Sequence, residues 1–216
     1  MKIDCGLNGF GRFGIHLLKY WLDNYSISRF DIKYINDDFL DNKKILELIL
    51  NDKKINFNNY KIKLKNNLLI IEDISNKSIK KIICTNSKSK DINWLGKPKL
   101  FFEASGKNTN RSDCLKFLKE NTSHVIISAT SNDADKTLIY SFNHDEFNSD
   151  CKIISYGSCT VNAYIPLAKY INTFYSIKDS DVSIVHNIPK YKLDDFNYIK
   201  KKKCTLEDSG PKLLNC

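Results

Sequence analysis

The chain has 216 residues, of which 42% are apolar, so it can build the core of one large domain or two small ones. No apolar run approaches the ~18 residues of a membrane span, and the first residues read as a strand and not as a secretion signal. We therefore expect no membrane partner. The net charge of +9 favours anionic partners in general, but the lysine run at Lys200 to Lys203 is interpreted as a solvated loop and not as a nucleic-acid site.

The cysteines indicate a reducing compartment. Their number is odd and no secretion signal accompanies them, which predicts reduced thiols in a cytoplasmic protein. They do not cluster with one another or with histidine, so we expect no metal site. The seven are Cys5, Cys84, Cys114, Cys151, Cys159, Cys204 and Cys216.

Strand-like and helix-like segments alternate along the chain. Strands are predicted over residues 2–8, 30–36, 80–84, 99–104, 125–129 and 152–155, helices over 13–22, 42–50, 112–119 and 160–174, and a hairpin over 60–72. Asn110 or Ser112 is expected to cap the third helix. Residues 181–185 form a further strand-like run. The alternation predicts an α/β fold with a parallel, doubly wound sheet.

A glycine fingerprint follows the first strand. Gly9, Gly11 and Gly14 form G-x-G-x-x-G at the start of the first helix, where glycine allows a tight turn, backbone approach to a pyrophosphate and close helix packing. Asp37 ends the second strand about 20 residues further on, which suits a carboxylate bound to the adenosine ribose. A carboxylate there repels a 2′-phosphate, so the pattern predicts NAD and not NADP. Asp38 is the alternative for the ribose role.

Cys159 lies between a predicted strand and a predicted helix. A thiolate there is stabilised by the positive end of the helix, which suits a nucleophile for covalent catalysis. A histidine is the usual general base beside such a thiol. Of the histidines in the chain, His186 is the best placed to act as this base, because it follows the strand-like run over residues 181–185. The other three are His16, His124 and His144.

Several of these motifs together resemble the glyceraldehyde-3-phosphate dehydrogenase family. The resemblance extends from residue 1 to about residue 188, and His186 stands at the family's spacing from Cys159. The residues that carry it are Asn8-Gly9-Phe10-Gly11-Arg12-Phe13-Gly14, Ile35-Asn36-Asp37, Ser128-Ala129, Phe142-Asn143-His144, Ser158-Cys159-Thr160-Val161-Asn162-Ala163 and Pro166-Leu167-Ala168-Lys169.

The resemblance implies a Rossmann-type doubly wound sheet followed by an incomplete α+β catalytic domain. Residues 1–157 would form the NAD-binding domain and residues 158–216 a partial catalytic domain. The implied reaction is the NAD-dependent, phosphorylating oxidation of an aldehyde. Cys159 would form a thiohemiacetal and then a thioester, His186 would act as base, and inorganic phosphate would release an acyl phosphate. The partners would be a phosphorylated aldehyde and inorganic phosphate. Whether the chain also forms a homo-oligomer is left open by the sequence.

The resemblance also assigns roles to individual residues. Ser158 and Thr160 match positions that contact substrate or phosphate. Ten residues match cofactor-binding positions: Asn8, Gly9, Gly11, Arg12, Phe13, Gly14, Asp37, Ser105, Gly106 and Ser128.

The chain departs from the family pattern at several positions. Asn108 replaces an aromatic residue that lies against the adenine, and Pro189 replaces a threonine that helps to hold phosphate. Ser87 stands near a usually basic position, for which the neighbouring Lys88 is the alternative, and Ala163 replaces a second cysteine. Family chains also continue far beyond residue 216. Two readings therefore stay open: a dehydrogenase acting on glyceraldehyde 3-phosphate or erythrose 4-phosphate, and a truncated, inactive homologue that serves as a dinucleotide-binding or interaction module.

Overall fold

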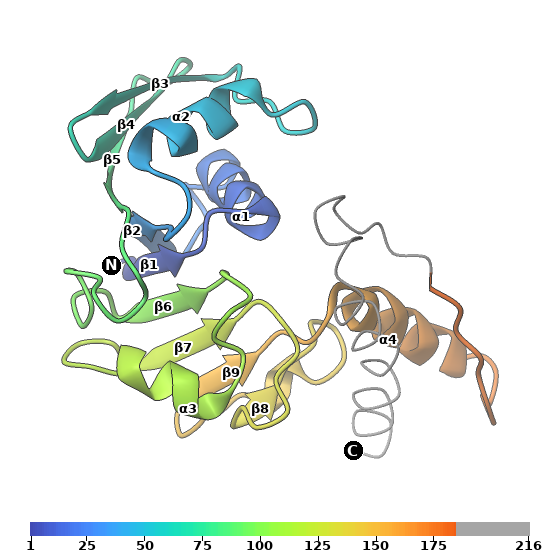
Figure 1. The fold of residues 1–216 in the computed structure, drawn as a ribbon. Helices are drawn as coiled ribbons and strands as arrows, with labels where there is room; N and C mark the ends of the chain where they lie inside the picture. The colour runs from blue at the N-terminus through green and yellow to red at the C-terminus, as the bar shows by residue number, and fades with distance from the viewer. Residues whose placement is uncertain (185–216) are drawn as a thin grey trace, which may run out of the picture.

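A computed structural model describes residues 1–184 of the chain (Figure 1). Within this range the strands form one sheet. In chain order they are β1 (Ile3–Asn8), β2 (Phe30–Asn36), β3 (Tyr60–Lys65), β4 (Leu68–Asp73), β5 (Ile79–Thr85), β6 (Leu100–Glu103), β7 (His124–Ile127), β8 (Lys136–Thr137) and β9 (Ile153–Ser155). Their order across the sheet is β3-β4-β5-β2-β1-β6-β7-β9-β8.

The centre of the sheet is parallel. β1 pairs with β2 on one side and with β6 on the other, and β6-β7-β9 continue in the same direction. Only the hairpin β3-β4 and the β4-β5 pair are antiparallel. This is the predicted Rossmann-type sheet. Because the chain crosses from one side of β1 to the other, the carboxyl end of β1 is the switch point at which such sheets bind ligands.

The described helices are α1 (Arg12–Asp23), α2 (Asn42–Asn51), the single turn α3 (Arg111–Cys114) and α4 (Cys159–Asn172). Two apolar cores lie on the two faces of the sheet. In β6, Phe102 packs with the core that includes α1 and α2, while its neighbour Phe101 packs with the core that includes α3 and the turn after it. Side chains of adjacent strand residues point to opposite faces, so this alternation shows that both faces are covered.

The third predicted helix is wrong in most of its length. Asn110 stands at the N-cap position, one of the two predicted, although its side chain makes no capping bond. Instead of a helix running to Lys119, however, the structure has α3 followed by a 3₁₀ turn at Leu115–Phe117. The chain must turn back there to enter β7. Glu120 adopts a positive φ of 45°, and the Asn121 N–H donates to the carbonyl of Gly96 at 3.0 Å. The tertiary path thus overrides the local helical preference. The two-residue strand β8 was not predicted.

α4 leaves the sheet and extends beyond its edge (Figure 1). Its first half packs Val161 and Ile165 against Ile139. Its second half is largely exposed: Leu167 and Tyr170 are 54% and 64% exposed, and Phe174, just past the end of the helix, is 66% exposed. Residues 181–184 are in neither helix nor strand, so the strand predicted over residues 181–185 is wrong in its described part. No partner strand lies alongside them among residues 1–184 to provide the hydrogen bonds of a ladder.

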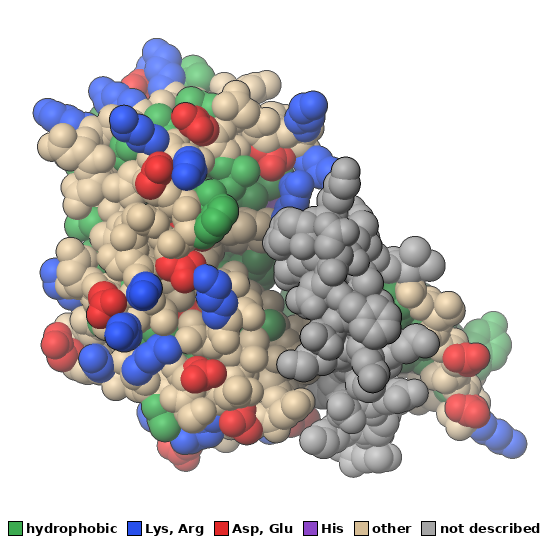
Figure 2. Space-filling view, viewed as in Figure 1, with side chains coloured by type: hydrophobic (Ala, Val, Ile, Leu, Met, Phe, Trp, Pro, Cys, Tyr) green, Lys and Arg blue, Asp and Glu red, His purple; other side chains and the backbone are tan. Residues whose placement is uncertain are grey.

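Positive and negative side chains are interspersed over the sheet domain on the face that Figure 2 shows. No helix of the described part is long and apolar enough to cross a membrane. Three features of the sequence lie outside the described residues: His186, Pro189 and the run from Lys200 to Lys203.

Candidate active site

The loop after β1 needs glycine at its first position. Gly9 has φ +94°, and a Cβ placed on it would lie 2.4 Å from the backbone N of Ser105. Gly14 lies in the first turn of α1, and a Cβ there would lie 2.7 Å from the carbonyl oxygen of Gly9. Both contacts involve backbone atoms, which cannot move aside without displacing β6 or α1. The first and third glycines therefore hold the strand, loop and helix in close contact.

The second glycine has a different environment. A Cβ on Gly11 would meet nothing within 4 Å, so the loop faces open space here. α1 begins directly afterwards, without a side-chain cap and without an acidic residue in its first turn. The N–H groups of that turn and the helix dipole favour an anion. The loop thus fits the pyrophosphate of a dinucleotide, which such a helix start binds through backbone N–H groups.

Arg12 and Phe13 occupy this first turn. The guanidinium of Arg12 lies 3.4 Å from the Asp52 carboxylate at the end of α2, and its side chain is 63% exposed. The Asp52 side chain is only 7% exposed, but the long, single contact leaves the exposed Arg12 guanidinium with further N–H groups for a ligand phosphate. The Phe13 ring turns toward Tyr156, with ring centroids 6.1 Å apart. Tyr156 comes three residues before Cys159, so this contact joins the glycine loop to the segment that carries the cysteine.

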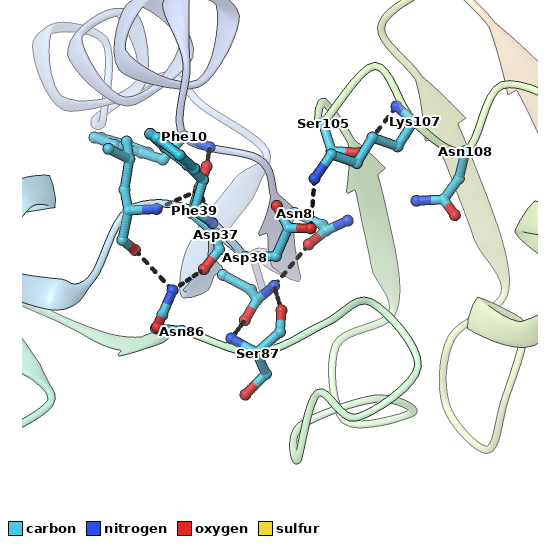
Figure 3. Close-up of polar contacts among 12 residues, drawn as sticks. Asn8, Phe10, Asp37, Asp38, Phe39, Asn86, Ser87, Ser105, Lys107 and Asn108 are labelled. Atoms are coloured by element: carbon cyan, nitrogen blue, oxygen red, sulfur yellow. Dashed lines mark hydrogen bonds and ion pairs between the residues drawn. The ribbon is translucent and has the colours of Figure 1, made fainter.

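Asp37 lies at the carboxyl end of β2, as predicted, but most of its carboxylate is already bonded (Figure 3). It accepts hydrogen bonds from the backbone N–H groups of Phe10 at 2.7 Å, Phe39 at 2.8 Å and Leu40 at 2.8 Å. A carboxylate has about four acceptor sites, so about one is left for a ribose hydroxyl. Asp37 therefore braces two loops of the crevice in addition to any contact with a ligand.

A buried carboxylate that the sequence motifs did not single out lies on the other side of β1, at the end of β6. This is Glu103, which is 1% exposed. It accepts bonds from Asn8 Nδ2 at 2.8 Å, Asn108 Nδ2 at 3.0 Å and the Ser105 N–H at 2.8 Å, and from the Ser105 hydroxyl. Asn108 is thus turned inward, where it also accepts a bond from Lys116 Nζ at 2.7 Å. Two predicted cofactor residues, Asn8 and Ser105, are held in place by this carboxylate.

The amide network continues into β2. Asn36 Nδ2 donates to Asn8 Oδ1 at 2.8 Å, and the Thr85 hydroxyl donates to Asn36 Oδ1 at 2.8 Å. Trp94 Nε1 donates to that hydroxyl at 3.0 Å. Together with Glu103, the network cross-links the carboxyl ends of four neighbouring strands, β5, β2, β1 and β6. A bonded network of this kind rigidifies the edge at which a ligand would bind. In the sequence, polar residues at the ends of otherwise apolar strands were the pattern that could have predicted this network.

Burial gives Glu103 a pH signature. Desolvation raises its pKa above the ordinary value of 4.5, although four hydrogen bonds oppose the shift. A raised folded-state pKa means that the native state holds the proton more tightly, so this stabilisation is complete below pH 4.5 and is lost as pH rises through the raised pKa. Relative to Glu103→Gln, the free energy of unfolding of the native sequence should fall over that window by up to about 1.4 kcal/mol per pH unit. Urea unfolding at a series of pH values measures the difference, and parallel curves for the two proteins would contradict it.

Ser128 and Gly106 are the remaining predicted cofactor residues within the described range. The Ser128 N–H, just after β7, donates to the Glu103 carbonyl at 2.9 Å. Gly106 follows Ser105, and a Cβ on it would meet nothing within 4 Å. Residues from β1, β2, β6 and β7 thus meet at one edge of the sheet, as the parallel strand order requires.

Cys159 is the first residue of α4 and is exposed. Ser158 caps the helix: its hydroxyl accepts from the Val161 N–H at 3.1 Å. The Thr160 Oγ1 lies 4.0 Å from the Cys159 Sγ. The Cys159 side chain lies at the positive end of the helix dipole. The structure therefore gives Cys159 the position expected of a nucleophile.

Hydrogen bonds fix the turn before Cys159. The Tyr156 N–H donates to the Ile127 carbonyl at 2.9 Å, and the Gly157 N–H to the Ser155 hydroxyl at 2.9 Å. Asn162 closes the turn from the helix side, since its Nδ2 donates to the carbonyls of Tyr156 at 2.7 Å and Ser158 at 2.9 Å. Tyr156 and Asn162 were not predicted as site residues, but they position the thiol.

The described cysteines should differ sharply in reactivity. Burial raises the pKa of Cys5, Cys84 and Cys114 to about 12, and Cys151 is also buried, whereas Cys159 is exposed. Because only the accessible thiolate reacts quickly, iodoacetamide at neutral pH should modify Cys159 before the other four. Peptide mapping after brief treatment checks this order, and earlier labelling of any of the four buried thiols would contradict it.

Among residues 1–184, no group of three or more His, Cys, Asp or Glu side chains is arranged to hold a metal ion.

The chain is similar to curated proteins named glyceraldehyde-3-phosphate dehydrogenase. It is 32% identical over 190 residues to the protein of Yarrowia lipolytica, a match that covers 87% of this chain and 53% of the relative. It is 30% identical over 190 residues to the cytosolic protein of Taxus baccata, with the same coverage, and 28% identical over 184 residues to protein 1 of Bacillus cereus. The chain spans about half the length of these relatives. No family model matches it.

Proposed function

Because the chain belongs to the glyceraldehyde-3-phosphate dehydrogenase family, we propose that it binds NAD and oxidises a phosphorylated aldehyde through Cys159. Residues 1–157 form the NAD-binding domain in this proposal, and residues 158–216 are the first part of a catalytic domain. The observation that carries it is the position of Cys159. An exposed thiol begins α4, and the turn before it contacts the first turn of α1 through Tyr156 and Phe13.

The dinucleotide would lie across the carboxyl edge of the sheet. The N–H groups of the first turn of α1 would bind the pyrophosphate, since Gly11 leaves the loop open there. Asp37 would accept from an adenosine ribose hydroxyl, and Ser105, Gly106 and Ser128 would line the edge beyond β1. Bound NAD would supply the hydride acceptor.

The covalent chemistry would take place at Cys159. Its thiolate would attack the aldehyde carbon to form a C–S bond, and the carbonyl oxygen would be protonated to give a thiohemiacetal. The Cys159 N–H, at the start of α4, would stabilise the developing oxyanion. A base would then remove the hydroxyl proton as hydride leaves the same carbon, which gives a thioester. Attack by inorganic phosphate would break the C–S bond, release an acyl phosphate and restore the thiolate.

His186 is the proposed base, on its resemblance to the family's catalytic histidine. Ser158 and Thr160 are the proposed contacts to substrate or phosphate. In the structure the Ser158 hydroxyl is engaged as the helix cap, so Thr160 is the more accessible of the two.

A second candidate function is a dinucleotide-binding or interaction module without turnover. The observation that favours it is the apolar surface formed by the second half of α4 and the residues just after it, where Leu167, Tyr170 and Phe174 are exposed. Exposed apolar side chains at helical spacing are typical of a surface that binds another protein. This module would keep the NAD-binding edge described above.

Kinetic and binding measurements on the purified chain test the proposal. With NAD, glyceraldehyde 3-phosphate and inorganic phosphate, the dehydrogenase should form NADH continuously, and omission of phosphate should stop turnover. Erythrose 4-phosphate in a parallel series distinguishes the two aldehydes. Calorimetric NAD binding without NADH formation would favour the module, and the absence of both would contradict the proposed function.

A further inference from the structure

We propose that the ion pair between Asp38 and Lys107 sets how strongly this chain discriminates NAD from its 2′-phosphorylated analogue, NADP. The inference rests on the proposed dinucleotide site. It assigns a role to two residues outside the motifs: Asp38 is the alternative to Asp37 for the ribose role, and Lys107 belongs to no predicted motif.

The pair bridges two loops that flank the end of β1. Asp38 follows β2, Lys107 follows β6, and the Lys107 Nζ lies 2.5 Å from the Asp38 Oδ2 (Figure 3). The two residues are 69 positions apart in the chain. Because β2 and β6 lie on either side of β1, the pair lies at the switch point where a dinucleotide would enter.

The position of the adenosine ribose follows from the same geometry. In this type of fold, the ribose hydroxyls meet the acidic residue at the end of the second strand. That strand is β2, and Asp37 ends it with a carboxylate that already holds three backbone N–H groups. The next side chain is Asp38, which is 29% exposed, and its partner Lys107 is 63% exposed. These two charged side chains are therefore exposed enough to respond to a substituent on the ribose.

The charges of the three residues predict the preference. Asp37 and Asp38 each carry a negative charge and Lys107 carries a positive one, so the site is net negative and disfavours a 2′-phosphate. Lys107 reduces that repulsion and is long enough to turn from Asp38 toward a phosphate on the ribose. Removing Lys107 should make the discrimination against NADP stronger, whereas neutralising Asp38 should make it weaker.

Calorimetric titration of the full chain with NAD and with NADP tests the pair. Lys107→Ala should weaken NADP binding about tenfold and change NAD binding less than about twofold, because a charge-assisted bond is lost for one ligand only. Asp38→Asn should strengthen NADP binding by a similar factor. Lys61→Ala, at an exposed lysine on β3, is the matched control and should leave both affinities unchanged.

The outcomes separate the two levels of the hypothesis. One outcome is that the native chain binds NAD while both Lys107→Ala and Asp38→Asn keep the native ratio of NADP affinity to NAD affinity. In that case the specificity role is wrong and the NAD site stands. A change of the same size for both ligands would also overturn the role. If neither dinucleotide binds the native chain, the proposed function fails together with the inference.

Discussion

Replacing Cys159 by serine should abolish NADH formation from NAD and glyceraldehyde 3-phosphate. A serine hydroxyl is a far weaker nucleophile than a thiolate at neutral pH, and the neighbouring side chains of Ser158 and Thr160 are hydroxyls as well. Loss of a catalytic nucleophile typically lowers turnover by at least about 10,000-fold. Stopped-flow and steady-state measurements of NADH absorbance determine the loss of turnover.

NAD binding separates lost chemistry from lost structure. Because Cys159 is exposed and belongs to no apolar core cluster, its replacement should leave the affinity for NAD within about twofold. Cys151→Ser is the matched control: its thiol lies 3.5 Å from Asn148 Oδ1, and a serine hydroxyl can make the same bond. Turnover by Cys159→Ser above about 1% of the native rate would contradict the thioester route.

Replacing Gly9 by alanine should destabilise the whole domain. Its Cβ would lie 2.4 Å from Ser105 N and 2.5 Å from the Ala104 carbonyl carbon, both backbone atoms, and the residue has a φ of +94°. Steric overlap and an unfavourable φ together should lower the free energy of unfolding by about 3 kcal/mol or more. Urea unfolding measures this, and an alanine variant as stable as the native protein would contradict the described packing.

Gly11→Ala is the informative partner of that variant. Nothing lies within 4 Å of its added Cβ, so the free energy of unfolding should change by no more than about 1 kcal/mol. The same methyl group would stand where the backbone must approach the pyrophosphate, so NAD binding should weaken about tenfold or more. The two substitutions thus separate a glycine required for folding from a glycine required for binding.

The sequence predicted most of the sheet because its signals are local. Strands such as β1 and β2 are short apolar runs, and the glycines of the first loop follow the first strand directly, so neither depends on distant partners. The short length of α3 was not predicted, for the opposite reason. Its length is set by the turn at Glu120 and the bond from Asn121 to Gly96, which local helical preference does not reveal.

The site was predicted less completely than the fold. The motifs located Cys159 and Asp37, but they did not show that Phe10 binds the Asp37 carboxylate or that Glu103 holds Asn8. Those contacts depend on the register between β1, β2 and β6. The same holds for the ion pair between Asp38 and Lys107, whose partners meet only because β2 and β6 flank β1.

A single-turnover experiment without inorganic phosphate tests most directly whether Cys159 carries the acyl group. The chain is mixed with NAD and glyceraldehyde 3-phosphate, and NADH absorbance is recorded together with the intact mass of the protein. We predict about one equivalent of NADH per chain and a mass increase of one phosphoglyceroyl group located at Cys159, because the thioester cannot be released without phosphate. NAD binding with neither NADH nor an adduct, or an adduct at another residue, would contradict covalent catalysis at Cys159.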